Sequence, residues 1–456
     1  AAFNLMGYDV AAFGNHEFDW GQEVLCDRVG EAAYPYLAAN IVVKDAATCD
    51  ASGWTSPAFA QPYTILEVGT APNTVKVGVI GVTSTETPTI TIASATEGLC
   101  FKDPYDSIVH HYDYLKANSD VIVVLSHLGY TDGGYGYGIP VYGDQTLASK
   151  LIAAGKAVPL IIGGHTHTDL AAATVVGGKT SVVQAHYNGR KVGRADITVN
   201  PDGTVAVTWT RLVVGTSDPE DAAVKSLINS YATDPDYVAL VNTPIGYAQT
   251  DLLRNYNGDA MMGDFVDDAI YNALNNDGTP ENDLDMFFNN AGGIRIDWCD
   301  APDPVNPGAY IWSSATGDWQ PSVWAHDPML LNYGQMFQIL PFGNATIVGD
   351  MTGAQILDLL NQSATLFKGA LQPSGIRYKF FRYLDALPGP QPYAWGAYDV
   401  EVWDTSTSSY VPLDMGMTYR VGTNEFLAPA GQDGYLPFKY MTNISYWGDM
   451  LNAVNA

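Results

Sequence analysis

The sequence predicts an α/β (α+β) protein of two domains, and three observations lead to this prediction. The chain has 456 residues, more than one ordinary hydrophobic core supports. In the first half, short apolar runs alternate with helical stretches, which is typical of a layered α/β domain. From about residue 244 the composition shifts toward Asn, Trp and Tyr, which indicates a second, mixed α/β domain. We therefore expect domains at 1–214 and 244–456, joined by a linker helix region at 215–243.

In the first domain the elements follow from apolar runs and helical periodicity. Strands are expected at residues 8–13, 75–83, 120–125 and 158–162, and helices at 22–33, 107–117 and 147–154. Residues 181–214 alternate in strand fashion around a turn at 201–203. Polar clusters follow the ends of these strands, where α/β folds build their binding sites.

The linker and the second domain contain fewer clear signals. Ser217-Asp218-Pro219-Glu220 combines a capping side chain, an early proline and an acid, which predicts a helix running to about residue 231. In the second domain we expect helices at 262–274 and 354–366 and a strand at 284–289.

Composition and charge exclude several classes of partner. The chain is 47% hydrophobic and 15% charged, as globular proteins are. With 21 Lys and Arg against 49 Asp and Glu, its net charge is −28. Such a surface repels nucleic-acid polymers and anionic membranes. No apolar run reaches the ~18–20 residues that a transmembrane helix needs. A small-molecule substrate therefore remains the expected partner.

The four cysteines do not form a metal or redox motif. Cys26, Cys49, Cys100 and Cys299 include no Cys-x-x-Cys pair, which excludes a zinc ribbon and a thioredoxin-type site. Cys49 and Cys100 lie in polar, loop-like stretches. They would pair in an exported protein, but the sequence alone equally allows free thiols.

Three polar clusters in the first half each follow an apolar run. They are Asn15-His16 with Asp19, Ser126-His127, and His165 with His167. These are the residue types that hold divalent metals, and neutral imidazole is the commonest such ligand. Two metals about 3.5–4 Å apart lower the pKa of a bound water and clamp the oxygens of a phosphate ester. The clusters therefore favour a metal centre, of a kind from which phosphate-ester hydrolysis benefits.

The number of these histidines favours a site over a structural role. A single histidine after a strand is more often a hydrogen-bonded structural residue than a ligand. Here four of the eight histidines stand at predicted strand ends, namely His16, His127, His165 and His167. Coincidence explains one such histidine better than it explains four.

The motifs GNHEFD (14–19), SHLG (126–129) and GGHTHT (163–168), in this order, resemble the calcineurin-like metallophosphatases. The wider match GYDVAAFGNHEFDWG, followed by ANIV, is similar to the 5'-nucleotidase family, which includes UDP-sugar hydrolases and 2',3'-cyclic phosphodiesterases. The resemblance covers nearly the whole chain. It implies a layered β-sandwich metallophosphatase domain with flanking helices, then a 5'-nucleotidase C-terminal, nucleotide-binding domain.

The resemblance also implies roles for single residues in the first half. Asn15, His127 and His165 resemble ligands of one divalent metal, and His167 resembles a ligand of a second. The metals expected are Zn, Mn, Mg or Co. His16 is similar to the catalytic histidine of the family, and Asp19 is expected to orient it through a hydrogen bond. Glu17 belongs to the motif without an assigned role.

The chain departs from the family near its start. The family also has an Asp-x-His and a later Asp that bridges both metals, and nothing before Gly14 supplies them. Asp9 is the only acid there, and no histidine precedes His16. Either the first strand and a half precede residue 1, which we expect, or the second metal has been lost. As it stands, the piece is expected to bind metal poorly.

Three motifs in the second half have the character of a nucleotide site. FFNNAGGIR (287–295) ends a strand in a glycine turn, so that backbone and Arg295 can approach a phosphate. LPFGN (340–344) and NEFLAPAGQDGY (424–435) each carry an aromatic ring on a turn. Two exposed rings, Phe342 and Phe426, could sandwich a base, although a single phenylalanine is more often a core residue.

The same family has these motifs in its second domain, in the same order. By that resemblance Phe342 and Phe426 would clamp the base, Asn344 would contact its edge, and Asp433 the ribose. Asn290 and Arg295 fall on binding positions, and Arg254 resembles an earlier family arginine.

The sequence therefore predicts metal-dependent hydrolysis of nucleoside monophosphates to nucleoside and phosphate. A UDP-sugar or a 2',3'-cyclic nucleotide is the alternative substrate. A nucleotide-binding surface protein with an incomplete metal site is the alternative of another class, and an acidic secreted scaffold is a third. The expected location is extracellular, periplasmic or at the cell surface.

Overall fold

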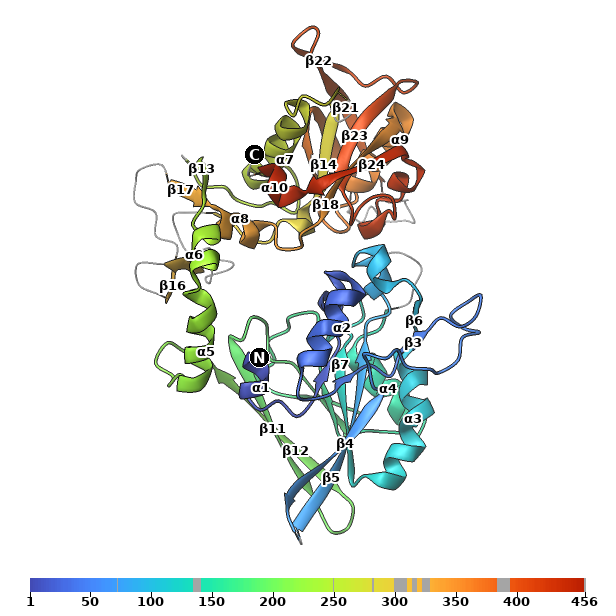
Figure 1. Ribbon diagram of the computed structural model, residues 1–456. Helices are drawn as coiled ribbons and strands as arrows, with labels where there is room; N and C mark the ends of the chain where they lie inside the picture. Colours follow the sequence, from blue (N-terminus) through green and yellow to red (C-terminus); the bar gives the residue numbers. More distant parts are fainter. Residues whose placement is uncertain are drawn as a thin grey trace. The chain divides into compact units, whose positions relative to one another are not determined.

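The computed structural model describes the chain apart from residues 72, 134–140, 249, 281–282, 299–309, 314–317, 322–328, 384–393 and 455–456. The chain forms two compact units, Ala1–Ser230 and Tyr231–Ala456, each with its own central sheet (Figure 1).

The first unit is built on a six-stranded sheet of order β4-β5-β7-β8-β10-β9. Its strands are β4 (Tyr63–Thr70), β5 (Asn73–Thr83), β7 (Val121–His127), β8 (Leu160–Ile162), β9 (Thr174–Val176) and β10 (Thr180–Val183). The four inner strands are parallel, and β4 and β9 run antiparallel at the two edges. The parallel strands therefore end together, and the segments 126–129 and 163–168, at the ends of β7 and β8, leave the sheet at that edge.

Helices cover one face of this sheet and a β-hairpin covers the other. Helices α3 (Pro104–Asn118) and α4 (Asp144–Ala153) pack through Ile108, Leu115 and Leu147 on Ile80 and Val124. On the opposite face, Val123, Leu160 and Val183 meet side chains of the hairpin β11 (Lys191–Val199) and β12 (Val205–Val213), including Trp209. This arrangement is the predicted layered sandwich with flanking helices.

Smaller elements complete the first unit. They are α1 (Ala2–Leu5), β1 (Ala11–Ala12), the 3-10 helix η1 (His16–Phe18), α2 (Gly21–Glu31), β2 (Tyr36–Leu37), β3 (Ile41–Val43), η2 (Thr87–Thr89), η3 (Ala93–Thr96) and β6 (Leu99–Phe101). Cys49 and Cys100 form a disulfide that joins the segment after β3 to β6. The structure thus decides between the two thiol states that the sequence left open.

Helices α5 (Ala222–Ala232) and α6 (Pro235–Val241) lie within the predicted linker region. Helix α6 is capped at its N-terminus: the Asp234 side chain accepts hydrogen bonds from two backbone N–H groups of the first turn, and Pro235 occupies a position that needs no donor.

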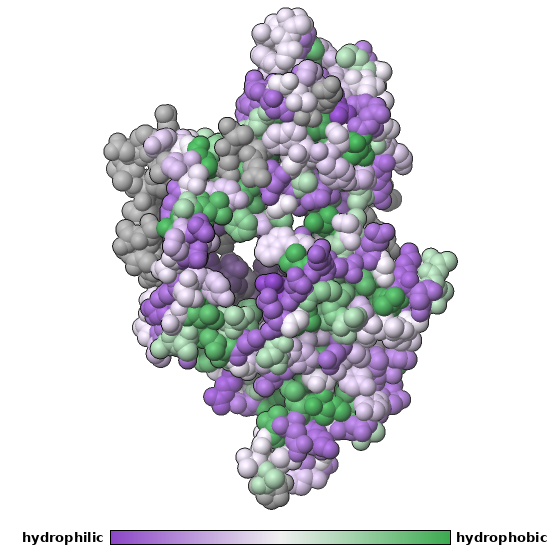
Figure 2. Space-filling model, viewed as in Figure 1, coloured by the Kyte–Doolittle hydropathy of each residue, from purple (hydrophilic) through white to green (hydrophobic). Residues whose placement is uncertain are grey.

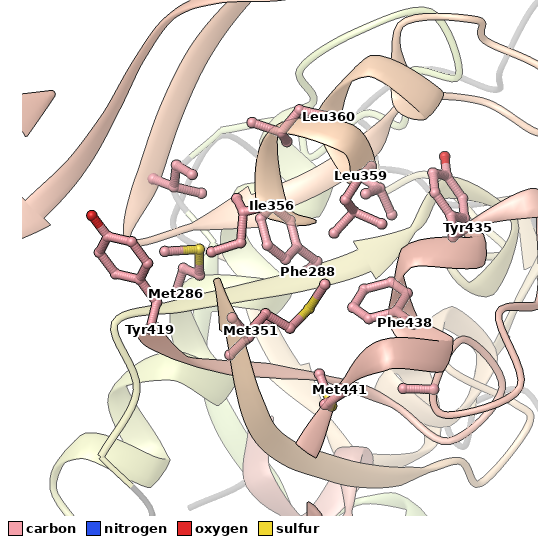
Figure 3. Packing of buried hydrophobic residues seen from close by; sticks show 14 of the residues in the cluster. Met286, Phe288, Met351, Ile356, Leu359, Leu360, Tyr419, Tyr435, Phe438 and Met441 are labelled. Atoms are coloured by element: carbon pink, nitrogen blue, oxygen red, sulfur yellow. The ribbon is translucent and has the colours of Figure 1, made fainter. Parts of the chain in front are cut away.

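The second unit is built on a five-stranded mixed sheet of order β19-β14-β23-β18-β24. Its strands are β14 (Met286–Asn290), β18 (Ala345–Thr352), β19 (Leu371–Ser374), β23 (Thr418–Asn424) and β24 (Thr442–Asp449). Helix α7 (Met261–Asn275) covers one face, where Val266 and Ile270 contact Phe287 and Val348. Helix α9 (Gly353–Ser363) covers the other, with Phe288, Met351 and Phe438 beneath it (Figure 3).

Other elements surround this sheet. They are β13 (Pro244–Ala248), η5 (Ala291–Gly293), β15 (Tyr310–Ser313), β16 (Asp318–Pro321), β17 (Met329–Asn332), α8 (Tyr333–Ile339), β20 (Ile376–Tyr383), β21 (Ala394–Asp404), β22 (Ser409–Pro412), η6 (Gln432–Gly434), η7 (Leu436–Tyr440) and α10 (Met450–Val454). The motif segments follow β14 and β23, which are parallel neighbours, so they leave the sheet at one edge.

The predicted elements reappear with shifts of a few residues at their ends, with one larger difference. The strand expected at 8–13 shrinks to β1, Ala11–Ala12, because its partner β2 offers only Tyr36 and Leu37 for pairing.

Polar side chains cover much of the face seen in Figure 2, and apolar ones form several separate patches. Within the described part of the chain, no helix combines the length and the apolar character needed to cross a membrane.

Candidate active site

The first predicted cluster folds into a tight turn directly after β1. Asn15 precedes the 3-10 helix η1, and the Glu17 carboxylate accepts a hydrogen bond from the Gly14 backbone N–H at 2.6 Å. Glu17, which had no assigned role, thus closes the turn that presents Asn15 and His16. The Asp19 carboxylate lies 2.7 Å from His16 Nδ1, so it fixes the orientation of an imidazole that is 52% exposed.

Asn15 meets two histidines from separate strands. Its Oδ1 lies 3.1 Å from His127 Nε2, at the end of β7, and 3.1 Å from His165 Nδ1, three residues beyond β8. The structure therefore brings together three side chains that are up to 150 positions apart in the sequence.

The His127 ring packs against two glycines, where any side chain would overlap it. A Cβ atom at Gly14 would lie 2.7 Å from the ring, and one at Gly164 would lie 3.0 Å from it. Burial, reinforced by repulsion from His165, His16 and His167, lowers the pKa of His127 to about 3. The imidazole is therefore neutral at physiological pH, which is the form that binds metal.

The second histidine pair leaves the sheet in strained backbone. His165 and His167 have φ angles of 72° and 56°, in the left-handed region that side chains rarely adopt. The buried Gln184 supports this loop, donating to Gly164 O at 2.6 Å and accepting from the Thr168 backbone N–H. His167 is exposed and stacks on Tyr187, with ring centroids 5.0 Å apart. Strain of this kind is typical of functional loops.

Two acidic residues that the sequence did not single out border the cluster. Glu86, 3% exposed, places Oε2 3.9 Å from His165 Nε2. Asp144 is fully buried at the start of α4 and accepts from Ser126 Oγ at 2.5 Å. Burial raises the pKa of Asp144 to about 7. Neither residue stands in a local motif, so only the folded chain identifies them.

The residues present fit part of a metal site. Asn15, His127 and His165 offer one amide oxygen and two imidazoles around one point, a suitable donor set for a divalent ion. Within the ranges that the structure describes, no group of three or more His, Cys, Asp or Glu side chains is arranged to hold a metal. His167 alone does not make a second site, so the described residues fit one ion incompletely and do not fit a pair.

In the second unit, the structure joins two predicted binding residues directly. Asn290, at the end of β14, donates from Nδ2 to Asp433 Oδ2 at 3.1 Å. Asp433 lies in η6 with φ of 53°, flanked by the left-handed glycines Gly431 and Gly434. Asp433 is only 9% exposed.

Phe342 and Asn344 lie together on the turn before β18. They line a small pocket with Asn289, Gly293 and Leu340, and with Asp449, Met450 and Leu451 at the start of α10. The Arg295 guanidinium carbon lies 5.5 Å from the centroid of the Phe342 ring, which is a cation–π contact. The sequence had not pointed to the α10 residues.

The two remaining candidates have structural contacts of their own. Arg254 pairs with Asp297 through Nε at 3.2 Å and donates from a terminal nitrogen to Arg295 O at 2.6 Å. It thereby holds the backbone of the Arg295 segment. Phe426 is partly buried against the hydrophobic cluster beneath α9. Their roles in binding a substrate stay predictions.

Comparisons with known protein families match both halves of the chain. Residues 3–169 match the calcineurin-like phosphoesterases, and residues 238–440 match the 5'-nucleotidase C-terminal domain. The 5'-nucleotidase of Rattus norvegicus is 30% identical over 96% of this chain and 71% of the rat protein. The crystal structure of a 5'-nucleotidase precursor from Thermus thermophilus superposes with a TM-score of 0.70 at 26% identity, covering 99% of this chain and 80% of that one.

Two further relatives differ in length and setting. The trifunctional nucleotide phosphoesterase protein YfkN of Bacillus subtilis is 27% identical over 95% of this chain, which spans only 28% of YfkN. A snake venom 5'-nucleotidase of Naja atra is 27% identical over 98% of this chain and 79% of the venom protein. The relatives thus include a venom protein and one far longer than this chain.

Calcineurin-like phosphoesterases are hydrolases that use divalent metals, and proteins with the accompanying C-terminal domain act on small nucleotides. On these matches, this chain belongs to the 5'-nucleotidase family of calcineurin-like phosphoesterases.

Proposed function

We propose that this protein hydrolyses nucleoside 5'-monophosphates to nucleoside and phosphate. The observation that carries the proposal is the convergence of Asn15, His127 and His165, with Asn15 Oδ1 3.1 Å from a ring nitrogen of each histidine. The second unit supports the nucleoside part of the proposal, because Asn290 and Asp433 are joined there and Phe342 lines a nearby pocket.

His16 is proposed to act on the phosphoryl group. The Asp19 carboxylate, 2.7 Å from Nδ1, would orient the imidazole, and the ring is exposed and so accessible to substrate. A protonated imidazole there would stabilise the negative charge that grows on the phosphoryl oxygens in the transition state.

Asn15, His127 and His165 would hold one divalent ion, and His167 would contribute to a second. A bound ion of this kind supplies Lewis-acid activation of water and of the phosphoryl oxygens. The identity of the ions, Zn, Mn, Mg or Co, and their number are part of the proposal. That an Asp-x-His pair and a bridging Asp complete the set stays a prediction.

The nucleoside would be held by side chains of the second unit. Phe342 and Phe426 would contact the base, Asn344 its edge, and Asp433 the ribose hydroxyls. Arg295, and with it Arg254, would bring positive charge to the phosphate in a chain of net charge −28. Asn290 would hold Asp433 in position.

The test is phosphate release from AMP by the complete gene product, purified with Mn²⁺ or Zn²⁺. UDP-glucose and 2',3'-cyclic AMP are assayed beside it, because a UDP-sugar or cyclic nucleotide is the alternative substrate. AMP is expected to give the highest kcat/KM. A folded protein that binds adenosine but releases no phosphate from any of the three would establish the alternative, a nucleotide-binding protein without catalysis.

The domain boundaries and the location are proposals as well. Domains at 1–214 and 244–456 with a linker region at 215–243 are supported by the two compact units, which divide at Ser230 and Tyr231. A location outside the cytoplasm is supported by the Cys49–Cys100 disulfide and by the venom relative.

A further inference from the structure

Three amide side chains form a row across the central sheet of the second unit. Gln372, Asn289 and Asn424 lie on the adjacent strands β19, β14 and β23. Asn289 is directly opposite Gln372 in the antiparallel register, and the register of β14 with β23 places it beside Asn424. All three are at most 1% exposed. Because neighbouring positions in register face the same side of a sheet, the three amides share the face that helix α7 covers.

The orientation of the Asn424 amide is fixed by its partners. Its Oδ1 accepts from the Leu427 backbone N–H at 2.9 Å, and its Nδ2 donates to Asn289 Oδ1 at 2.8 Å and to Asn290 Oδ1 at 3.0 Å. The Asn290 amide then donates to Asp433 at 3.1 Å. A chain of hydrogen bonds thus leads from Asn289 to the two side chains proposed to serve the nucleoside.

Beside Asn289 lies a buried carboxyl group on α7, Asp267. Asp267 is 0% exposed, and burial raises its pKa well above the usual range, against a smaller lowering by the Asn289 amide. Neither Asp267 oxygen nor Asn289 Nδ2 has a hydrogen-bond partner in the described part of the chain, and the same holds for Gln372 Oε1. Buried polar atoms without partners are rare and call for a reason.

These unpartnered atoms complement one another chemically. A protonated carboxyl offers one acceptor, which matches Asn289 Nδ2, and one O–H donor, which matches Gln372 Oε1. The helix also approaches closely here, because a Cβ atom at Gly263, one turn before Asp267, would lie 2.2 Å from Gln372 Oε1. Helix α7 thus passes close to the Gln372 side chain at Gly263.

We propose that Asp267 is a positioning residue for the nucleoside, acting through Asn289 and Asn424 to set the orientation of Asn290 and Asp433. The inference rests on the proposed function, because it assigns Asp267 to the nucleoside half of that site. Asp267 contacts no substrate itself. It fixes the Asn289 amide, so that the Asn424 amide donates to both Asn289 and Asn290. Asn290 in turn holds the Asp433 carboxylate in its orientation.

The experiment compares Asp267→Leu with Asp267→Asn in the full-length protein. Leucine removes the acceptor for Asn289, whereas asparagine keeps an acceptor and a donor at nearly the same volume. Adenosine binding is measured by calorimetry, and KM and kcat are measured with AMP. Turnover of p-nitrophenyl phosphate, which has no nucleoside, is measured beside them. Asp268→Ala is the matched control, because Asp268 is the next residue of α7 but bonds to Ser374 Oγ, outside the row.

Asp267→Leu is expected to weaken adenosine binding and raise KM for AMP about tenfold or more, with turnover of p-nitrophenyl phosphate within about twofold of wild type. Asp267→Asn is expected to restore most of the affinity, and Asp268→Ala to leave it unchanged. If leucine at 267 prevents folding, Asp267→Ser replaces it, since serine is too short to reach Asn289, and the same loss is expected.

A folded Asp267→Leu or Asp267→Ser protein that binds adenosine as tightly as the wild type would overturn the inference while leaving the proposed function intact. Equal losses in Asp267→Asn and Asp267→Leu would also overturn it, because an acceptor and a donor at nearly the same volume would then not replace the carboxyl group. If the wild-type protein neither binds adenosine nor releases phosphate from AMP, the proposed function fails, and the inference fails with it.

Discussion

At the level of single residues, the first unit shows how little freedom the candidate site leaves to its histidines. His127 is fixed between two glycines, kept neutral by burial, and held to Asn15. His16 has the opposite character, because it is exposed and restrained by one carboxylate. A buried ligand and an exposed reactive group are what a site needs if it is to hold an ion and still admit a substrate.

Replacing His16 with Ala is expected to lower kcat for AMP by about 10²–10³-fold, because one donor to the transition-state charge is lost. KM should change little, and the melting temperature should stay the same for so exposed a side chain. Steady-state kinetics with the Asp19→Asn variant as a companion checks this, and the companion is expected to lose less. Unchanged turnover in His16→Ala would remove His16 from the mechanism.

Because Asp144 is buried, the free energy of unfolding is expected to depend on pH. Its pKa in the folded state, about 7, exceeds the ordinary value of 3.8, so the folded protein binds the proton more tightly than the unfolded chain between these values. The stabilisation from Asp144 is thus present below pH 4 and declines as the pH rises toward 7. The free energy of unfolding of Asp144→Asn, relative to wild type, should therefore rise with pH by up to about 1.4 kcal/mol per unit. Urea unfolding at pH 4, 5, 6 and 7 measures this difference, and a difference that does not vary with pH would contradict the assignment.

The site residues that could be predicted stand in local sequence patterns, whereas those that could not are defined by contacts in the folded chain. His127 and His165 were visible because each follows an apolar strand run, and parallel strands end at one edge of a sheet. Asp144 and Gln184 gave no such signal. Their role comes from contacts with Ser126 and Gly164, which the fold creates across 18 and 20 positions. A buried polar partner is defined by tertiary contacts, and a single sequence does not record them.

At the level of elements, the turn before β18 carries two of the residues proposed to bind the base. Phe342 stands on this turn, in contact with Arg295 and beside Asn344. Replacing Phe342 with Ala is expected to raise KM for AMP about tenfold or more, because base stacking is worth roughly 1–3 kcal/mol. Turnover of p-nitrophenyl phosphate, which has no base, is the control and should not change. An unaltered KM would return Phe342 to the role of a packing residue.

The disulfide ties the segment after β3 to β6, and β3 itself pairs with β6 over three residues. It closes a loop of sequence separation 51. Replacing both Cys49 and Cys100 with Ser is expected to lower the free energy of unfolding by about 2–5 kcal/mol. Urea unfolding measures the loss, and a reductant should lower the stability of wild type but not of the double variant. Equal responses of the two proteins would contradict a stabilising role.

The bounds of a strand were predicted well where the apolar run pairs with a long neighbouring strand, and poorly where the neighbouring strand is short. Residues 75–83 became β5 because they pair along their length with β4 and β7. Residues 8–13 have the same apolar character but pair only at Ala11 and Ala12. Strand length is set by the partner, which the local sequence does not specify.

At the level of the whole molecule, the two units have separate cores, which predicts two separable unfolding transitions. Mn²⁺ should raise the melting temperature of one transition and adenosine that of the other. At 100 times the dissociation constant, each ligand should add about 2.7 kcal/mol to its own unit. Differential scanning calorimetry with each ligand alone checks this. A single transition shifted by both ligands would show that the units unfold together.

Asp433 is presented on a backbone conformation that glycine would adopt with less strain. Glycine there would relieve the strain, but it would leave the buried Asn290 amide without its acceptor and would discard the carboxylate proposed to bind ribose. The strained backbone at position 433 thus serves both stability and substrate affinity. Engineering that raises the melting temperature of this protein should leave position 433 fixed from the outset.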